Sequence, residues 1–223
     1  MRILTIADEE CSALWEYYQP GKLREYDLIV SAGDLKADYL TFLVTAARCP
    51  LMYVHGNHDT GYAKRPPEGC DCIDDKLMIY KGLRILGLGG CRQYHPGAHQ
   101  YTEKQMRKRI RKLKGAIRLA GGVDIVVAHA APKGVGDAED IAHRGFAAFL
   151  DLMDTYHPKY FLHGHLHMNY ATGVPRIQQY GKTQVVNCCE RYALDVDQPE
   201  VICWGFGKRL LSRMMKNLEI IDY

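Results

Sequence analysis

Short apolar runs rich in β-branched residues alternate along the chain with longer stretches in which apolar positions recur at helical spacing. The runs predict eight strands: Arg2–Ala7, Leu28–Ala32, Leu51–His55, Leu77–Tyr80, Leu83–Gly87, Asp124–Ala128, Tyr160–His163 and Thr183–Asn187. Several are apolar almost throughout, as strands buried on both faces are. The longer stretches predict helices near residues 10–19, 36–48, 103–119, 142–156 and 207–217. This alternation predicts an α/β fold with helices on the faces of a sheet.

Length and composition are those of one globular domain. Of the 223 residues, 47% are hydrophobic and 25% are charged, which excludes a mainly disordered chain. Without an apolar run long enough to span a membrane, we expect no membrane partner. The N-terminal sequence has acids at positions 8–10 and no small-residue cleavage site, so we expect no secretion signal. We expect one domain over residues 1–223, whose amphipathic C-terminal segment near 206–223 covers the sheet or contacts another subunit.

Charge and cysteine content narrow the class of partner and the compartment. A net charge of +3 is too small to predict a polyanionic partner by itself. The eight cysteines are irregularly spaced and form no CxxC pair, although Cys70 and Cys72 are close and Cys188 and Cys189 are adjacent. This usage favours reduced thiols in a cytoplasmic protein over disulfides or a structural zinc site.

Polar side chains cluster where the predicted strands end. The clusters are Asp8, Asp34, Asn57–Asp59, His129 and His165–His167. In open α/β sheets ligands bind at the carboxyl ends of strands, so we expect these side chains to converge. Carboxylate, amide and imidazole groups together suit Mn, Fe or Zn better than Ca. The set is large enough for two cations about 3.5–4 Å apart, bridged by one carboxylate.

The same residues carry a resemblance to a known family. The segments SAGDLK (31–36), HGNHD (55–59), VVAHAAP (126–132) and LHGHLH (162–167), after a strand that ends in Asp8, resemble the motifs of calcineurin-like metallophosphoesterases. The resemblance implies a four-layer α/β/β/α sandwich with a binuclear metal centre. It also implies a phosphohydrolase that cleaves a phosphomonoester or phosphodiester by in-line attack of metal-bound hydroxide. The centre would hold two divalent metal ions, for which manganese is favoured and Fe, Zn, Mg and Ni are alternatives.

The family's roles carry over to matching positions. The implied metal ligands are Asp34 as the bridge, Asn57, His129 and His165 on the second metal, and Asp8 and His167 on the first. His58 matches the catalytic histidine, which is not a ligand but protonates or stabilises the leaving oxygen.

Two positions depart from the family's pattern. Where the family has Asp-x-His, this chain has Glu10. Glu10 either ligates the first metal, which would favour Mn or Mg, or lies in the first turn of a helix where negative charge is favourable. The family's helper aspartate is replaced by Ala37, with Asp38 one position later. We therefore expect His58 to be oriented by another group, such as Asp59 or a main-chain carbonyl.

Three segments outside the motifs are candidates for binding. Arg92, in the loop Gly89–Gln100, is a candidate phosphate contact, although an ordinary polar turn explains it as well. Residues 137–144 are a candidate rim of the site, although Asp140 could equally cap the helix that follows. The helix predicted over 103–118 has eight basic residues around an apolar stripe, which is more typical of a solvated face than of a nucleic-acid surface.

Two other functions remain open on the sequence alone. One is a non-catalytic binding scaffold with the phosphoesterase fold, supported by Glu10 and opposed by His58. The other is a nuclease that uses the basic helix 103–118 to bind its substrate. An oligomer formed through the C-terminal segment is also compatible with the sequence.

Overall fold

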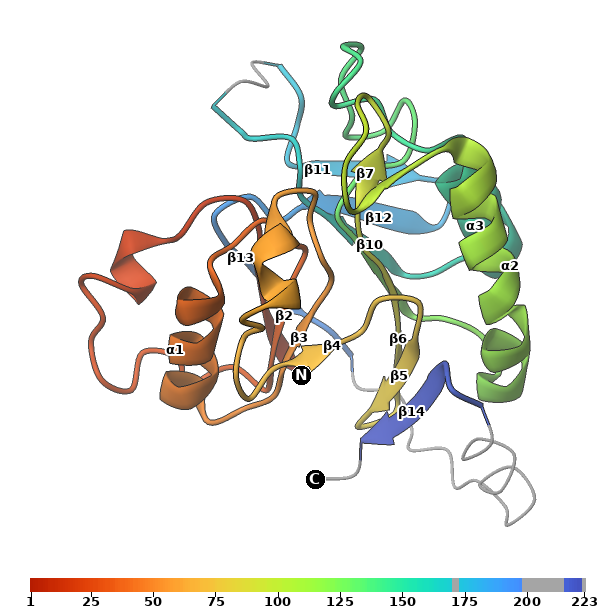
Figure 1. Cartoon of the computed structure of the whole chain (residues 1–223). Coiled ribbons are helices and arrows are strands. Elements are labelled where there is room, and N and C mark those ends of the chain that lie inside the picture. The colour runs from red at the N-terminus through yellow and green to blue at the C-terminus, as the bar shows by residue number, and fades with distance from the viewer. Residues whose placement is uncertain (170–172, 198–214, 222–223) are drawn as a thin grey trace.

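A computed structural model of the chain describes residues 1–169, 173–197 and 215–221 (Figure 1). Its strands form a five-stranded sheet in the order β13-β1-β2-β3-β4, a seven-stranded sheet in the order β11-β12-β10-β9-β6-β5-β14, and a small pair β7-β8. The strands are β1 (Arg2–Ile6), β2 (Leu28–Ser31), β3 (Leu51–Tyr53), β4 (Asp71–Cys72), β5 (Leu77–Tyr80), β6 (Leu83–Leu88), β7 (Cys91–Arg92), β8 (Gln100–Tyr101), β9 (Ile125–Ala128), β10 (Tyr160–His163), β11 (Ile177–Tyr180), β12 (Thr183–Asn187), β13 (Tyr192–Asp195) and β14 (Leu218–Ile221). Pairing is parallel except between β1 and β13, β5 and β6, and β11 and β12.

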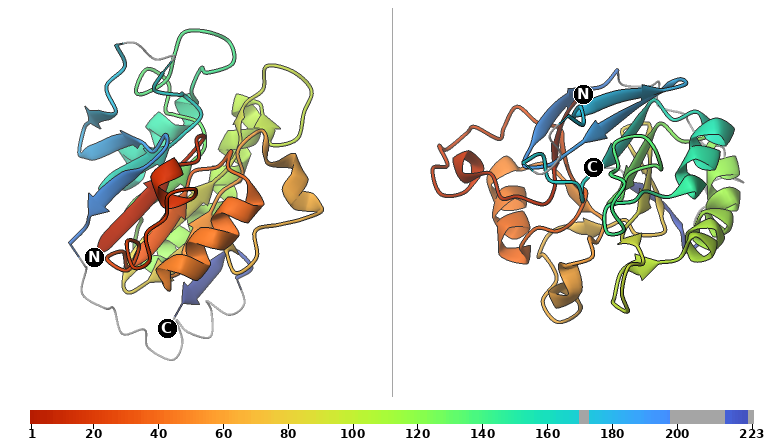
Figure 2. Two further views of the ribbon diagram at one scale, coloured as in Figure 1. Left: turned by 90° about the vertical axis from the view of Figure 1, so that its left-hand side faces the viewer. Right: turned by 90° about the horizontal axis from the view of Figure 1, so that it is seen from above.

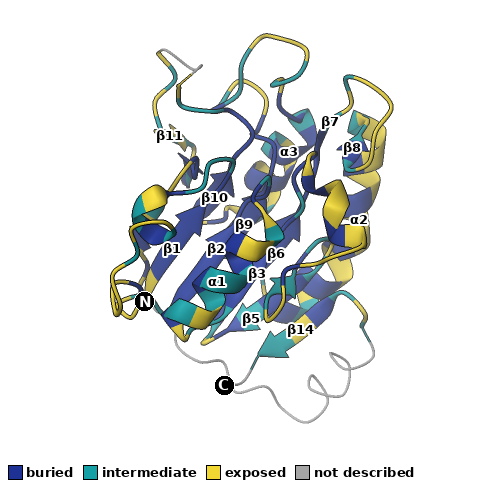
Figure 3. Ribbon diagram, turned by 60° about the vertical axis from the view of Figure 1, so that its left-hand side comes forward, coloured by how far each residue is buried: buried dark blue, intermediate teal, exposed yellow. Residues whose placement is uncertain are grey.

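The two large sheets face each other, and helices cover their outer faces (Figure 2). Helix α1 (Ala37–Ala47) packs on the five-stranded sheet, while α2 (Glu103–Ala120) and α3 (Ala147–Tyr156) pack on the seven-stranded sheet. Neighbouring residues of one strand enter different cores: Ile3 packs between the sheets, and Leu4 packs under α1. The central strands of both sheets are therefore buried on both faces, which explains their nearly continuous apolar runs (Figure 3). The predicted α/β class is confirmed.

Helix α2 shows how the local sequence sets the boundaries of an element. Thr102 accepts the main-chain N–H of Gln105, whose side chain accepts the N–H of Thr102, which is a capping box. The helix ends at Gly121, whose φ of 80° is easily adopted only without a side chain. Its apolar stripe is buried and most of its basic residues face solvent (Figure 3). No helix among the described residues is long and apolar enough to cross a membrane.

The eight predicted strands are present, but one predicted helix is replaced by turns and another is shorter than predicted. Residues 10–19 contain only a 3-10 turn at Ser12–Leu14, so the predicted α-helix there is wrong. The helix predicted over 142–156 starts at Ala147, because the Asp140 carboxylate accepts the N–H groups of Ala142 and His143 and closes a turn instead.

The C-terminal segment also differs from its prediction in the part that can be described. Residues 206–214 of that amphipathic segment lie outside the described residues. Leu218–Ile221 form β14, which pairs in parallel with β5 and extends the edge of the seven-stranded sheet. This part of the segment is thus a strand of the sheet and not a helix covering it.

Candidate metal centre

The polar residues that follow five strands meet at one end of the two sheets. Asp8, Asp34 and Asn57 follow β1, β2 and β3, while His129 and His165 follow β9 and β10. Asp8, Asp34 and His165 have φ values of 62°, 59° and 69°. Non-glycine residues adopt this left-handed conformation rarely, and such strain concentrates at functional sites.

Two glycines allow the loops to approach closely enough for these side chains to meet. A Cβ atom at Gly56 would lie 2.0 Å from Oδ1 of Asp34, and one at Gly33 would lie 2.4 Å from the main-chain nitrogen of Gly56. Gly33 also has a φ of 97°. Any side chain at either position would push the Asp34 and Asn57 loops apart.

Three of the predicted second-metal ligands converge on the fourth, the buried ring of His129. Its Nε2 lies 3.2 Å from Oδ2 of Asp34 and 3.1 Å from Oδ1 of Asn57. Its Nδ1 donates to the carbonyl of Ala32 at 2.8 Å, which leaves Nε2 to face the two oxygens. His165 completes the group, since its ligand atom lies within 4.8 Å of those of Asp34 and His129. Two oxygens and two imidazoles directed at one point are a donor set that fits a transition-metal cation.

The tautomer of His165 is set by the segment predicted to form the rim. Nε2 of His165 donates to the main-chain carbonyl of Ala142 at 2.8 Å, and the ring of His143 packs against it at 5.1 Å. Nδ1 of His165 therefore has the lone pair available for a metal. Burial and the charge of His129 lower the pKa of His165 to about 3, so the ring is neutral and ready to bind.

Charge is concentrated on the pair formed by Asp34 and His129. Burial raises the pKa of Asp34, but the charge and hydrogen bond of His129 and the N–H of His58 outweigh it and hold this pKa at about 2. Burial likewise lowers the pKa of His129, and Asp34 reverses this and raises it to about 9. Without a cation, the proton on His129 balances the Asp34 carboxylate.

Asp8 supplies a second indication of a cation. Its Oδ1 accepts the N–H of His165 at 2.9 Å, while its buried Oδ2 has no hydrogen-bond partner among the described residues. Burial raises the pKa of Asp8 to about 6. A buried carboxylate oxygen without a partner is costly, and a cation beside it removes that cost. The residues therefore fit the predicted two-metal centre.

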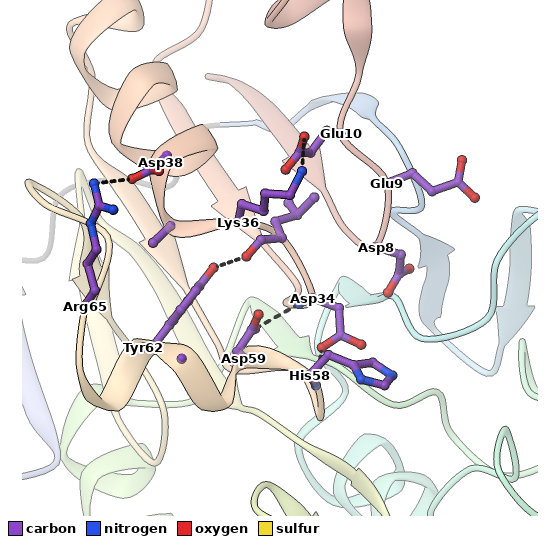
Figure 4. Close-up of a pocket in the computed structure, with 13 residues that line it drawn as sticks. Asp8, Glu9, Glu10, Asp34, Lys36, Asp38, His58, Asp59, Tyr62 and Arg65 are labelled. Carbon is purple, nitrogen blue, oxygen red and sulfur yellow. Dashed lines mark hydrogen bonds and ion pairs between the residues drawn. The ribbon is translucent and has the colours of Figure 1, made fainter.

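The two glutamates that follow Asp8 point in different directions (Figure 4). Oε2 of Glu10 lies 3.2 Å from Nζ of Lys36, at the wall of the pocket. Glu9 points the other way, and its Oε1 lies 2.9 Å from Nδ1 of His167. No α-helix forms at residues 10–19, so Glu10 does not lie in the first turn of a helix. The metal-ligand interpretation of Glu10 stays a prediction.

His58 lies at the pocket wall beside Asp34, whose Oδ1 accepts the His58 main-chain N–H at 2.7 Å. Asp59 does not hold the His58 ring: its Oδ2 accepts the N–H groups of Gly56 and Asp34 at 2.7 and 2.9 Å and joins the two loops. Asp38 is paired with Arg65 at 2.9 Å. Among the described side chains, neither aspartate therefore takes the orienting role left open by Ala37.

A pocket of about 680 Å³ opens over these residues (Figure 4). Its walls are formed by Asp8, Glu9, Glu10, Asp34, Leu35, Lys36, Ala37, Asp38, His58, Asp59, Gly61, Tyr62 and Arg65. Asp8, Glu9 and Glu10 lie on one side of the pocket and Arg65 lies with Asp38 on the other (Figure 4). Lys36 and Arg65 are the basic residues among those that line it. This volume is in the usual range for small-molecule sites, about 300–1,000 Å³.

The loop around Arg92 contributes a different residue from the one expected. Arg92 ends β7 and is not among the residues that line the pocket, so its role as a phosphate contact stays a prediction. Tyr94 of the same loop accepts the amide Nδ2–H of Asn57 at 3.4 Å. That contact fixes which way the Asn57 amide faces. In the sequence, the only indication of this role for Tyr94 is that it lies in a polar loop that follows a strand.

Comparison with known proteins identifies the family. The family model described as a calcineurin-like phosphoesterase superfamily domain matches residues 1–201. The chain belongs to this superfamily. The calcineurin-like phosphoesterase is also similar to a protein named lariat debranching enzyme from Caenorhabditis briggsae, with 26% identity over 191 residues. That match covers 65% of this chain but only 34% of the relative, so the chain spans about a third of the relative's length.

Solved structures show the same fold for this calcineurin-like phosphoesterase. One crystal structure superposes with a TM-score of 0.61 at 15% identity, covering 87% of this chain and 94% of the other. The crystal structure of TT1561 from Thermus thermophilus gives a TM-score of 0.58 at 16% identity, over 85% of this chain and 89% of that one. At these identities the similarity establishes the fold alone.

Proposed function

We propose that this calcineurin-like phosphoesterase is a binuclear metal-dependent hydrolase that cleaves a phosphomonoester or phosphodiester. The observation that carries the proposal is the convergence of Asp34, Asn57, His129 and His165 beside the unpartnered Oδ2 of Asp8. We further propose manganese at the second site, since its oxygen and imidazole ligands suit that ion. The cytoplasmic location predicted from the sequence stays a prediction.

The cations would be held by the ligand groups described above, and when bound they would supply Lewis-acid stabilisation and an ionised water nucleophile. The protein's own groups supply the rest. Lys36 and Arg65 attract the anionic substrate to the pocket. His58, exposed at the pocket wall next to Asp34, would donate a proton to the leaving oxygen. The Asp59 carboxylate would hold the loop of His58 against the loop of Asp34 during this step, because it accepts N–H groups from both.

A nuclease is the second candidate, favoured by the similarity to a lariat debranching enzyme. The basic helix α2 gives it less support, because α2 lies on the outer face of the seven-stranded sheet and contributes no residue to the pocket. Two of its arginines are already engaged: Arg107 pairs with Asp151, and the buried Arg109 pairs with Asp75 at 2.8 Å. A nucleic-acid substrate would have to bind through the pocket walls instead.

A screen of phosphomonoesters, phosphodiesters and nucleic acids with added Mn, Fe, Zn, Mg or Ni tests the proposal. We expect metal-dependent hydrolysis in the unaltered protein and almost none in Asp34→Asn or His165→Ala, with His157→Asn, at the exposed end of α3, as control. Tight metal binding without hydrolysis of any ester would favour the scaffold. Failure to bind any divalent metal would contradict the proposal itself.

A further inference from the structure

Glu9, His167 and Cys189 form a cluster of three different ligand types next to Asp8. One ligand atom from each, a carboxylate oxygen, an imidazole nitrogen and the thiol sulfur, all lie within 4.8 Å of one another. Oε1 of Glu9 is 2.9 Å from Nδ1 of His167 and also accepts Nδ2–H of Asn169 at 3.4 Å. His167 is the residue that the family resemblance assigns to the first metal.

The backbone holds Cys189 in this cluster through contacts that involve both motif loops. Cys189 forms an isolated bridge with Ala7, the residue before Asp8. Its N–H donates to Oδ1 of Asn187 at 2.8 Å, and Nδ2 of Asn187 donates to the carbonyl of Leu166 at 2.7 Å. Asn187 therefore ties the Cys189 main chain to the loop that contains His167. This arrangement fixes Cys189 rather than leaving it as an incidental buried residue.

The conformation of Asp8 explains why Glu9 faces the cluster and Glu10 does not. Asp8 is left-handed, with a φ of 62°, so the chain turns sharply after β1. Glu9 then points toward His167, and Glu10 points toward Lys36 (Figure 4). Glu10, whose partner is a cation, has its charge already balanced.

We infer that Glu9 and Cys189, together with Asp8 and His167, hold the first cation, in place of the family's histidine at position 10. This inference rests on the proposed metal-dependent function. A thiolate ligand is soft, so this site favours zinc or iron, and the two sites of the centre differ in metal preference. A cysteine binds a cation as the thiolate, so its proton is released to solvent when the metal binds.

Anaerobic titration of the full-length protein with Co²⁺ tests the assignment without any assay of activity. Cobalt bound to a thiolate gives an intense near-ultraviolet charge-transfer band, whereas cobalt bound only to nitrogen and oxygen does not. We expect two equivalents of cobalt, one of which produces the band. We also expect Cys189→Ser to lose the band and to release about one proton fewer per molecule at pH 7.

Matched variants separate this cluster from its neighbours. Cys188→Ser is the control for position 189, because Cys188 is buried and its thiol contacts the carbonyl of Val186 instead. Glu9→Gln should weaken the band-forming site by at least about tenfold, while Glu10→Gln should leave it unchanged. Cys72→Ser tests the other cysteine-containing group, formed by His55, Cys72 and Asp74.

The outcomes distinguish failure of this inference from failure of the proposed function. Two equivalents of cobalt without the band would show a binuclear centre without Cys189 and overturn the inference. A band that survives in Cys189→Ser but disappears in Cys72→Ser would overturn it as well. Loss of affinity in Glu10→Gln but not in Glu9→Gln would restore Glu10 as the ligand. If no cobalt binds at all, the proposed metal-dependent function fails too.

Discussion

Nε2 of His129 lies 3.2 Å from Oδ2 of Asp34, and this contact joins the ends of strands from the two facing sheets. The histidine is fully buried, and its other ring nitrogen is held by the carbonyl of Ala32. Burying this charged pair costs desolvation free energy. A cation bound between Nε2 of His129 and Oδ2 of Asp34 would replace the proton on His129.

Metal affinity at the second site should rise with pH. Asp34 raises the pKa of His129 to about 9 in the metal-free protein, so below that pH a cation must displace a proton from Nε2. With one proton released, the affinity should increase about tenfold per pH unit between 6 and 8. Chelator-competition titrations at pH 6, 7 and 8 measure this slope. An affinity independent of pH would mean that His129 is neutral before the metal binds.

Asp8→Asn should stabilise the metal-free protein while weakening the first metal site. Burial raises the pKa of Asp8 from 3.8 to about 6, so the folded state holds the proton more tightly than the unfolded state. Stability should therefore fall as the pH rises from about 4 to 6, and stay reduced above that range, by at most about 3 kcal/mol. Urea unfolding with chelator present measures the loss.

Asp8→Asn is the comparison variant for the urea-unfolding experiment. Its free energy of unfolding should lack the decrease between pH 4 and 6, because the ionisable group is gone. Its cobalt or zinc content should fall by about one equivalent. A variant less stable than the unaltered protein at pH 7 would mean that the Asp8 carboxylate has a partner in the metal-free state.

The sheet interior could be predicted from the sequence because its strands are buried on both faces. Runs such as those of β1, β9 and β10 are short, mostly apolar and buried almost throughout, which is typical of strands covered on both faces. The two-residue strands β4, β7 and β8 are too short to show any periodicity. The strand β14 has a sequence that also suits an amphipathic helix, and its pairing with β5 depends on a distant contact.

The candidate site was predictable where motif residues follow buried strands, as Asp34 and His129 do. The choice between Glu9 and Glu10 was not, because it depends on the left-handed conformation of Asp8, which spacing does not reveal. The membership of Cys189 in the ligand cluster could not be predicted from the sequence either. Cys189 comes into the cluster through its bridge to Ala7, which follows a strand of the other sheet, and through the hydrogen bonds of Asn187.

His58→Ala should lower turnover by about 10²–10⁴-fold for an alkyl ester, the usual scale for general acid catalysis. The loss should be much smaller for an aryl ester, whose leaving group has a low pKa and needs little protonation. Metal content should not change, since only the main-chain N–H of His58 is hydrogen-bonded to Asp34. Steady-state kinetics on paired alkyl and aryl substrates measure both effects. Equal losses would instead assign His58 an electrostatic or positioning role.

Lys36→Ala should raise KM about three- to tenfold and leave kcat nearly unchanged. The Lys36 side chain is 80% exposed at the pocket wall, so it attracts the anionic substrate without reaching the ligand cluster. A rim charge of this kind acts mainly on encounter, and salt screens it. The difference in KM between variant and unaltered protein should therefore shrink at high ionic strength. Lys22→Ala, outside the pocket, is the control.

Tyr94→Phe should weaken the second metal site about 10- to 100-fold, although Tyr94 is not a ligand. Its hydroxyl accepts Nδ2–H of Asn57 at 3.4 Å and so directs Oδ1 of Asn57 toward Nε2 of His129, where the cation would bind. Without that acceptor the amide can turn, and its nitrogen cannot bind a metal. Manganese content after dialysis, together with the manganese dependence of the rate, measures the effect. Tyr101→Phe is the matched control, because Tyr101 lies in the same loop region but packs beneath Arg109 instead. If the two variants retain manganese equally, the orientation of Asn57 does not depend on Tyr94.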